Sequence, residues 1–167
     1  GRHPHQAWFR QWSSTDEEAV FAALSQTGSA DLASRTLDEL SGGQRQRAWI
    51  SMVLAQNTDI LFLDEPTTYL DLATSVDILE LVDSLRQKLG RTVVMVLHDL
   101  NLAVRYSDYL VVMKEGQVIA SGAPADIITA ELLQQAFDLR ARVIEDPETG
   151  DPLIVPLRMK RPGFSSS

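Results

Sequence analysis

The chain has 167 residues, a formal net charge of −8 and no cysteine. This length suits one domain, the excess of acid argues against a broad binding surface for nucleic acid, and the cysteine count excludes disulfides and thiolate metal sites. No apolar run approaches the roughly 20 residues of a membrane-spanning helix, so we expect a soluble and most simply cytosolic chain.

The first dozen residues are aromatic and irregular, and they include His3 and His5. Two histidines without carboxylate or cysteine companions are weak support for a metal site, so we expect the aromatic rings to cover a helix end. A helix follows, with Ser14 or Thr15 as its cap and the acids of residues 16–18 in its first turn.

A glycine-rich stretch at residues 40–47, Leu-Ser-Gly-Gly-Gln-Arg-Gln-Arg, begins the next predicted helix. Ser41 is a typical helix cap, and Gly42 and Gly43 behind it can bring backbone N–H groups close to a ligand. Together with the helix dipole they predict an anion site, where Ser41 and Gln44 add side-chain donors to a phosphate. The alternative is an ordinary cap with a flexible Gly-Gly start.

Residues 60–66, Ile-Leu-Phe-Leu-Asp-Glu-Pro, are the stretch around which the predicted chemistry is arranged. The four apolar residues predict a fully buried parallel strand, which Pro66 ends because proline has no N–H for a ladder. Asp64 and Glu65 then lie at the carboxyl end of a strand, where open α/β sheets bind ligands. One carboxylate could hold Mg²⁺, directly or through water, and the other could accept a proton from an attacking water. The alternative is a solvated acidic turn.

A turn at residues 67–71, a helix to about Leu89 and a second apolar strand at residues 92–97 follow. Strand, helix and strand without a hairpin turn form a βαβ unit, so we expect the two strands to be parallel. His98 then lies at the same sheet edge as the two carboxylates. It could instead cap the next helix, although Asp99 suits that role better.

The rest of the chain is predicted to form two β-hairpins and several short helices. The hairpins turn at residues 114–117 and 146–151, and two short helices cover residues 124–137. The end of the chain, rich in serine, is predicted to be disordered.

These motifs resemble those of ABC-type ATPases, and they occur in the order and at the spacing of that family. Residues 40–44 resemble its signature motif, residues 60–65 its Walker B strand with the catalytic glutamate, residues 70–71 its D-loop, and His98 its switch histidine. The resemblance covers nearly the whole chain.

Three further stretches are similar to the ATPase subunits of iron-siderophore importers, with cobalamin and haem importers as neighbours. They are residues 96–101 (Val-Leu-His-Asp-Leu-Asn), residues 122–124 (Gly-Ala-Pro) and the Asp-Pro and Pro-Leu pairs within residues 146–153. The opening residues 2–5 also resemble the segment that leads into the helical subdomain of that subgroup.

One feature departs from the family. A phosphate-binding P-loop needs Gly-Lys followed by Ser or Thr, and this sequence contains no Gly-Lys pair. The adenine-stacking aromatic residue and the glutamine loop of the family have no counterpart either. The chain therefore resembles the carboxyl-terminal part of an ABC ATPase, and we expect an apolar sheet face and edge to be exposed.

The resemblance implies an α/β fold: a partial P-loop NTPase (RecA-like) parallel sheet with the ABC helical subdomain and a truncated core. It implies four parts in the chain. These are a helical subdomain with the signature motif (residues 1–55), the carboxyl-terminal part of the RecA-like ATPase core (56–128), a carboxyl-terminal extension (129–157) and a disordered tail (158–167).

The resemblance also implies roles for single residues. Asp64 orients Mg²⁺ through water, Glu65 activates the attacking water, and His98 contacts the γ-phosphate. In a head-to-tail homodimer, residues 41–44 bind ATP held by the partner subunit, and Asp71 crosses the two-fold axis.

For the parent protein, the resemblance implies an ATPase that powers uptake of a ferric siderophore, or of a related iron chelate, haem or cobalamin. Its cofactors are ATP and Mg²⁺. Its partners are membrane-embedded permease subunits and, indirectly, a substrate-binding protein, with no nucleic acid. Its place is cytoplasmic, peripheral on the inner face of the cell membrane.

Two other interpretations of the sequence remain open. A non-transport ABC ATPase of DNA repair or translation shares the signature, the Walker B strand and the histidine, although repair proteins usually carry long coiled-coil insertions that are absent here. The third interpretation is a non-catalytic interaction module. The missing P-loop suits that description for residues 1–167, which we expect to be inactive alone.

Overall fold

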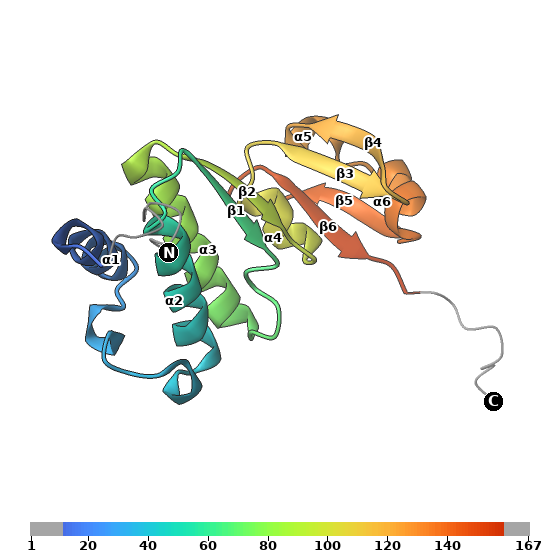
Figure 1. The fold of residues 1–167 in the computed structure, drawn as a ribbon. Coiled ribbons are helices and arrows are strands. Elements are labelled where there is room, and N and C mark those ends of the chain that lie inside the picture. The colour runs from blue at the N-terminus through green and yellow to red at the C-terminus, as the bar shows by residue number, and fades with distance from the viewer. Residues whose placement is uncertain (1–11, 159–167) are drawn as a thin grey trace, which may run out of the picture. The chain divides into compact units, whose positions relative to one another are not determined.

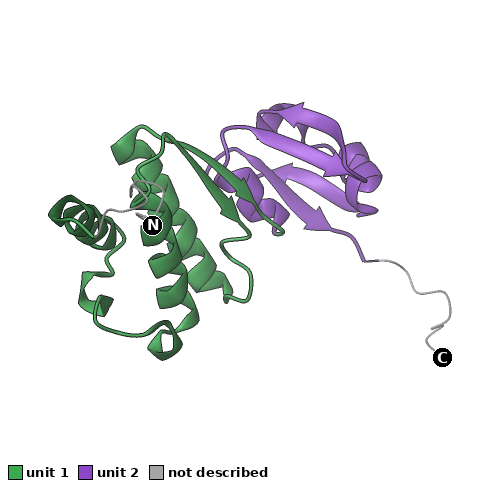
Figure 2. Ribbon diagram, in the orientation of Figure 1, with its two compact units in different colours: residues 1–98 green, residues 99–167 purple. Residues whose placement is uncertain are grey.

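The computed structural model describes residues 12–158, and the chain divides into two compact units, residues 1–98 and 99–167 (Figure 2). The length suited a single domain, but each unit has its own group of buried apolar side chains. The expectations for the first histidines and for the tail from residue 159 on lie outside the described residues. No helix within residues 12–158 is long and apolar enough to cross a membrane.

The first unit packs helices α2 and α3 against one side of a two-stranded sheet (Figure 1). Its elements in chain order are α1 (Ser14–Gln26), the 3-10 helices η2 (Ala30–Leu32) and η3 (Leu37–Glu39), α2 (Gly42–Leu54), β1 (Ile60–Asp64), α3 (Leu72–Leu89) and β2 (Thr92–Val96). Strands β1 and β2 run parallel, with Ile60 opposite Thr92 and Asp64 opposite Val96. The parallel pairing predicted from the βαβ pattern is confirmed.

Only one face of this sheet is covered by the described residues. Because side chains alternate along a strand, Leu61 and Leu63 point to the helices, where they are 3% and 8% exposed. They join a core contributed mainly by α2 and α3, which includes Ile50, Leu54, Ile78, Val82 and Leu85. Ile60 and Phe62 on the opposite face are 48% and 70% exposed. The prediction of a fully buried strand is therefore wrong for this structure, and the expected exposed apolar face is confirmed.

The cap of α1 lies one residue earlier than predicted. Ser13 is the N-cap, and its Oγ accepts a hydrogen bond from the Asp16 N–H at 3.2 Å. The Asp16 carboxylate in turn accepts from the Ser13 N–H at 3.2 Å, so the two residues form a reciprocal capping box. Ser14 and Thr15 also precede acids at this spacing, Glu17 and Glu18, so the spacing alone does not distinguish the two predicted caps from Ser13.

The second unit consists of two antiparallel hairpins and three short helices. In chain order they are α4 (Leu100–Arg105), β3 (Leu110–Lys114), β4 (Gln117–Gly122), α5 (Pro124–Ile127), α6 (Ala130–Phe137), β5 (Ala141–Glu145) and β6 (Pro152–Pro156). Both predicted hairpins are confirmed. The first turns through Glu115 and Gly116, which have φ of 51° and 76° as a tight two-residue turn requires.

The side chain of Asn101 ties α4 to β6 within this second unit. Its Nδ2 donates to the carbonyl oxygen of Ile154 at 3.2 Å, and the Ile154 N–H donates to its Oδ1 at 2.9 Å. The amide thus pairs with Ile154 as a neighbouring strand would. Asp99 caps α4 through the N–H groups of Asn101 and Leu102, as the sequence predicts.

Candidate functional site

Two adjacent strand ends bring Glu65 and His98 together in the first unit. Glu65 follows β1, and its N–H donates to the carbonyl oxygen of Val96 at 3.1 Å, which extends the pairing with β2 by one residue. His98 lies two residues beyond Val96, and its Nε2 is 2.6 Å from Oε1 of Glu65. The prediction that the carboxylate and the imidazole share one sheet edge is confirmed.

The backbone of Glu65 lies in the left-handed region, with φ of 49°. This conformation is costly for a residue with a side chain, and such residues gather at functional sites. It turns the chain sharply after the strand, so that the Thr68 N–H donates to the Glu65 carbonyl oxygen at 3.2 Å. The Thr68 hydroxyl also donates to Oε2 of Glu65 at 2.9 Å.

The two side-chain hydrogen bonds act on the charge of Glu65. The bond from His98 first, and the bond from Thr68 second, hold the pKa of the Glu65 carboxyl below its ordinary value of 4.5. The group is therefore an ionised acceptor near neutral pH. The side chains of His98 and Glu65 are 71% and 38% exposed, so a ligand or water in solution can reach the pair.

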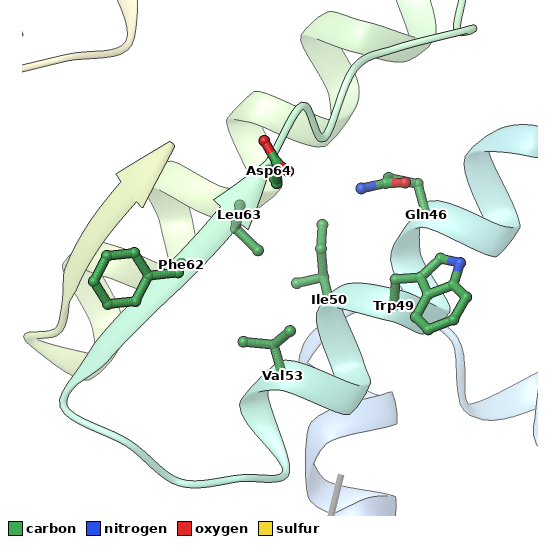
Figure 3. Close-up of a pocket in the computed structure, with 7 residues that line it drawn as sticks. All are labelled: Gln46, Trp49, Ile50, Val53, Phe62, Leu63 and Asp64. Atoms are coloured by element: carbon green, nitrogen blue, oxygen red, sulfur yellow. The ribbon is translucent and has the colours of Figure 1, made fainter. Parts of the chain in front are cut away.

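Asp64, the residue before Glu65, lines a pocket of about 290 Å³ together with other residues of β1 and α2. Figure 3 shows Gln46 of α2 at the same end of the pocket as Asp64. The remaining lining is mostly apolar and consists of Trp49, Ile50, Val53, Phe62 and Leu63. Within residues 12–158 no group of three or more histidine or carboxylate residues could hold a metal ion. Asp64 alone suits Mg²⁺ only as one ligand among waters and substrate phosphates, which is how Mg²⁺ is often bound.

The predicted anion site is built on the first turn of α2. Ser41 is the N-cap, as predicted, and its Oγ accepts from the Gln44 N–H at 3.3 Å. Gln44 Oε1 accepts from the Ser41 N–H at 3.0 Å. Both side chains serve as acceptors in these bonds, so the Ser41 hydroxyl hydrogen and the Gln44 NH₂ group can still donate to an anion. The N–H groups of Gly42 and Gly43 open the helix, where intrahelical acceptors are lacking.

The two glycines also allow close packing against the segment that follows β1. A Cβ at Gly42 would lie 3.2 Å from Leu70, and a Cβ at Gly43 would lie 2.8 Å from Cγ2 of Thr74. Thr74 in turn donates through its N–H and its hydroxyl to Asp71, at 2.9 and 2.8 Å. Asp71 is thus the N-cap of α3, and Thr74, which is hydrogen-bonded to Asp71, packs beside Gly43.

The structure therefore joins the predicted residues into two groups. One contains Glu65 and His98, and the other contains residues 41–44 with Asp71. Within residues 12–158 no hydrogen bond or ion pair links the two groups. Thr68 and Thr74 were not predicted as site residues, although each is a hydroxyl residue three positions after a carboxylate in a turn, a spacing that permits a local hydrogen bond.

Comparison with known proteins gives the same family as the motifs. A family model described as "ABC transporter" matches residues 3–68. The ferric enterobactin transport ATP-binding protein FepC of Escherichia coli (strain K12) is 51% identical over 100% of this chain and 62% of its own length. The chain belongs to the ABC transporter family of ATP-binding proteins.

Other relatives of this ABC protein carry similar names. The siderophore transport system ATP-binding protein YusV of Bacillus subtilis (strain 168), whose name is given as probable, is 54% identical over 93% of this chain and 57% of its own length. The iron(3+)-hydroxamate import ATP-binding protein FhuC of the same organism is 48% identical over 92% of this chain and 57% of its own length. The chain thus spans about three fifths of the length of these three curated relatives.

Solved structures confirm the α/β fold. An ABC transporter of metal-chelate type, solved in an inward-facing conformation, aligns with a TM-score of 0.85 and 31% identity over 94% of this chain and 63% of that chain. A bacterial ABC transporter cassette solved as a dimer aligns with a TM-score of 0.57 and 33% identity over 69% of this chain. Membership of this family implies ATP as the nucleotide.

Proposed function

We propose that this chain is the part of an ATP-hydrolysing subunit that carries the catalytic base, and that the subunit belongs to an ABC importer. The cargo of this importer is a ferric siderophore or a related iron chelate, haem or cobalamin. The observation that carries the ATPase assignment is the 2.6 Å contact between His98 Nε2 and Glu65 Oε1 at the ends of two paired parallel strands. The names of the relatives FepC, YusV and FhuC support the cargo.

The pair at the sheet edge supplies the base and the polarising donor. Ionised Glu65 accepts the proton of the water that attacks the γ-phosphate, because its low pKa keeps it deprotonated. His98 holds one carboxylate oxygen through its Nε2–H, and in this proposal the same hydrogen is shared with the charge that develops during hydrolysis. We therefore propose complementary roles for the two side chains, Glu65 as the base and His98 as the donor beside it.

Asp64 contributes at the neighbouring strand end. Mg²⁺, when bound with the nucleotide, neutralises phosphate charge. Asp64 is exposed at the end of β1 and carries a carboxylate that can orient the water shell of the ion.

Residues 41–44 and Asp71 serve a second subunit in this proposal. The open N–H groups of α2, with Ser41 and Gln44, bind the γ-phosphate of an ATP held by the partner in a homodimer. Asp71 contacts the partner across the two-fold axis with the lone pairs that its two bonds to Thr74 leave over. The dimeric cassette among the related structures supports this arrangement.

We further propose that the subunit lies on the cytoplasmic face of the membrane. It would drive membrane-embedded permease subunits and, through them, respond to a substrate-binding protein. The support is the family and the transport names of the relatives.

Hydrolysis requires a phosphate-binding loop that these 167 residues do not contain. One exposed helix start contributes only about 0.3–1 kcal/mol per charge interaction. Binding at tens of micromolar corresponds to roughly 6 kcal/mol. We therefore expect residues 1–167 alone to bind ATP weakly and not to hydrolyse it. A Gly-Lys-Ser/Thr loop encoded upstream of Gly1 would supply the missing element.

The decisive experiment is Glu65→Gln in the complete gene product. The amide keeps the shape of the side chain and loses the basic oxygen, so we expect unchanged ATP binding and a turnover lower by roughly 10²–10⁴-fold. Phosphate release and nucleotide binding are measured on matched samples. Glu18→Gln, an exposed change on α1, is the control and should leave both unchanged. Robust ATPase activity of residues 1–167 that depends on Glu65 would show that the nucleotide is held elsewhere.

Growth of a deletion strain on defined iron sources tests the cargo separately. We expect uptake of at least one ferric chelate to fail and to return with the wild-type gene but not with the Glu65→Gln variant. Unchanged uptake of every chelate, of haem and of cobalamin would remove the cargo assignment and leave the ATPase assignment intact.

A further inference from the structure

We propose that Thr68 is a positioning residue for Glu65, and that its hydroxyl fixes the rotation of the carboxylate so that one oxygen stays on His98. This inference rests on the proposed ATPase function, which makes Glu65 the base. Thr68 touches neither the reacting water nor the nucleotide in this assignment, because it acts only through Glu65.

The hydrogen bonds of the carboxylate carry the argument. His98 Nε2 lies 2.6 Å from Oε1, and Thr68 Oγ1 lies 2.9 Å from Oε2. The last torsion of a glutamate is soft, with broad minima, so one hydrogen bond leaves the carboxylate free to swing. Two donors on different oxygens restrict that torsion, because rotation breaks both bonds. Each oxygen keeps a lone pair that can receive a proton.

The turn after β1 places the Thr68 hydroxyl and holds it. Pro66, one residue after Glu65, is fully buried and anchors the turn to the first unit. The Thr68 N–H then closes the turn on the Glu65 carbonyl oxygen at 3.2 Å. The left-handed φ of 49° at Glu65 makes this closure possible. The strained backbone of the base and its second hydrogen bond are therefore parts of one local arrangement.

The side chain of Thr68 is less exposed than that of the residue that follows it in the turn. Tyr69, the next residue, is completely exposed at 102%. Thr68 is only partly exposed and is directed to the carboxylate. A threonine with a merely structural role in the turn would need only its backbone N–H, which a valine also has.

The expected consequence is a loss of turnover without a loss of binding. If the carboxylate swings, only a fraction of the molecules has the base in line with the attacking water. Misplacement of a catalytic group by about 1 Å can cost about a hundredfold in rate. We therefore expect Thr68→Val to lower kcat roughly tenfold to a hundredfold, with KM for ATP unchanged.

The kinetic test uses the complete gene product and three variants. Thr68→Val removes the hydroxyl and keeps the shape, whereas Thr68→Ser keeps the hydroxyl and should restore most of kcat. Thr92→Val at the start of β2 is the control for a threonine-to-valine change, with no expected effect. Thermal melts establish that each variant is folded, and Thr68→Ala replaces Thr68→Val if the latter is not.

A second readout needs neither ATP nor hydrolysis. Nitrogen NMR of residues 1–167, at a pH above the titration range of imidazole, reports which ring nitrogen of His98 carries the hydrogen. A fixed Glu65 carboxylate selects the Nε2–H form, and we expect Thr68→Val, but not Thr68→Ser, to raise the share of the Nδ1–H form.

The outcomes distinguish this inference from the proposed function. If the complete wild-type product does not hydrolyse ATP, the proposed function fails, and the NMR result alone decides whether Thr68 orders the pair. A lower kcat in Thr68→Val that Thr68→Ser does not restore would overturn the inference in favour of a packing role. A raised KM with unchanged kcat, or an unchanged His98 tautomer in Thr68→Val, would overturn it as well.

Discussion

At the scale of one residue, Asp71 combines a proposed contact with a second subunit and a structural role in the fold. Its carboxylate accepts two hydrogen bonds from Thr74 and so caps α3, while the family resemblance places the same residue at a subunit interface. The sequence predicted Asp64, Glu65, His98 and Ser41 at element ends because adjacent residues define those ends.

At this scale the partners across a turn were harder to predict, because the spacing from each carboxylate permits these hydrogen bonds without requiring them. Thr68 and Thr74 matter because a local backbone conformation brings each hydroxyl back to a carboxylate. A left-handed φ at a glutamate is not a preference that a sequence pattern indicates.

The cap at Asp71 predicts a pH dependence of stability. The bonds from the Thr74 N–H, first, and the Thr74 hydroxyl, second, hold the pKa of Asp71 below its ordinary value of 3.8. A pKa that is lower in the folded than in the unfolded state stabilises the fold fully above the unfolded value. That contribution is lost as the pH falls through the folded value. We therefore expect Asp71→Ala to lower the melting temperature at neutral pH and to have a shrinking effect below pH 3.8.

Melting by circular dichroism over a series of pH values measures this effect. Asp77→Ala, an exposed change on the same helix, is the control. A difference between wild type and Asp71→Ala that stays constant from neutral to acid pH would show that the charge of the cap is not involved.

At the scale of elements, the starts of α2 and α3 are packed against each other. The sequence predicted both helices, Ser41 as the cap of α2, and the two parallel strands that α3 connects, but it named no cap for α3. It did not predict that the Gly-Gly pair makes room for Thr74, because a glycine gives no sign of the neighbour that approaches it. The glycines thus have a packing reason alongside the anion site inferred from the sequence.

Because Gly43 packs against Thr74, we expect a substitution at Thr74 to compensate for a substitution at Gly43. In Gly43→Ala the new methyl group meets Cγ2 of Thr74 at 2.8 Å, and such overpacking typically costs about 1–3 kcal/mol. Thr74→Ser removes the opposing methyl and keeps the hydroxyl that bonds Asp71. We expect the double variant to regain the stability lost by Gly43→Ala, because alanine is otherwise favoured over glycine within a helix by about 1 kcal/mol.

Urea unfolding of the two single variants and the double variant measures the coupling. Gly90→Ala is a control variant that should lose stability for a different reason. Gly90 has φ of 61° and no atom near its missing Cβ, so that variant is strained without a clash. Thr74→Ser should not rescue it. Equal losses for Gly43→Ala with and without Thr74→Ser would contradict the proposed contact.

At the scale of the whole molecule, the chain is two units with separate cores joined at residues 98 and 99. Composition and length did not indicate this division, because the apolar pattern runs through both units without a polar linker between them. The functional division of the chain at residues 55, 128 and 157 stays a prediction. The exposed sheet face was foreseen from a missing motif, the P-loop, and not from the strand itself.

The exposed face of β1 and β2 should affect how the chain behaves in solution. Phe62 is 70% exposed, and around it Ile60, Val94 and Val96 are 48%, 44% and 50% exposed. An apolar face with open strand edges promotes association between chains. We therefore expect the apparent mass of residues 1–167 in light scattering to rise with concentration, and Phe62→Thr to reduce that rise. Because Phe62 is largely exposed and threonine suits a strand, the stability in urea should change by only about 0.5 kcal/mol.

Leu61→Thr is the matched control on the same strand. Leu61 is 3% exposed and packs in the core, so its replacement leaves a cavity and buries a hydroxyl. We expect it to cost about 2–5 kcal/mol and to increase association through unfolding. The two substitutions should therefore have opposite effects on association. Phe62→Thr removes exposed apolar surface from the folded state, whereas Leu61→Thr disrupts the core. A wild-type chain that remains strictly monomeric at high concentration would show that this face does not drive association.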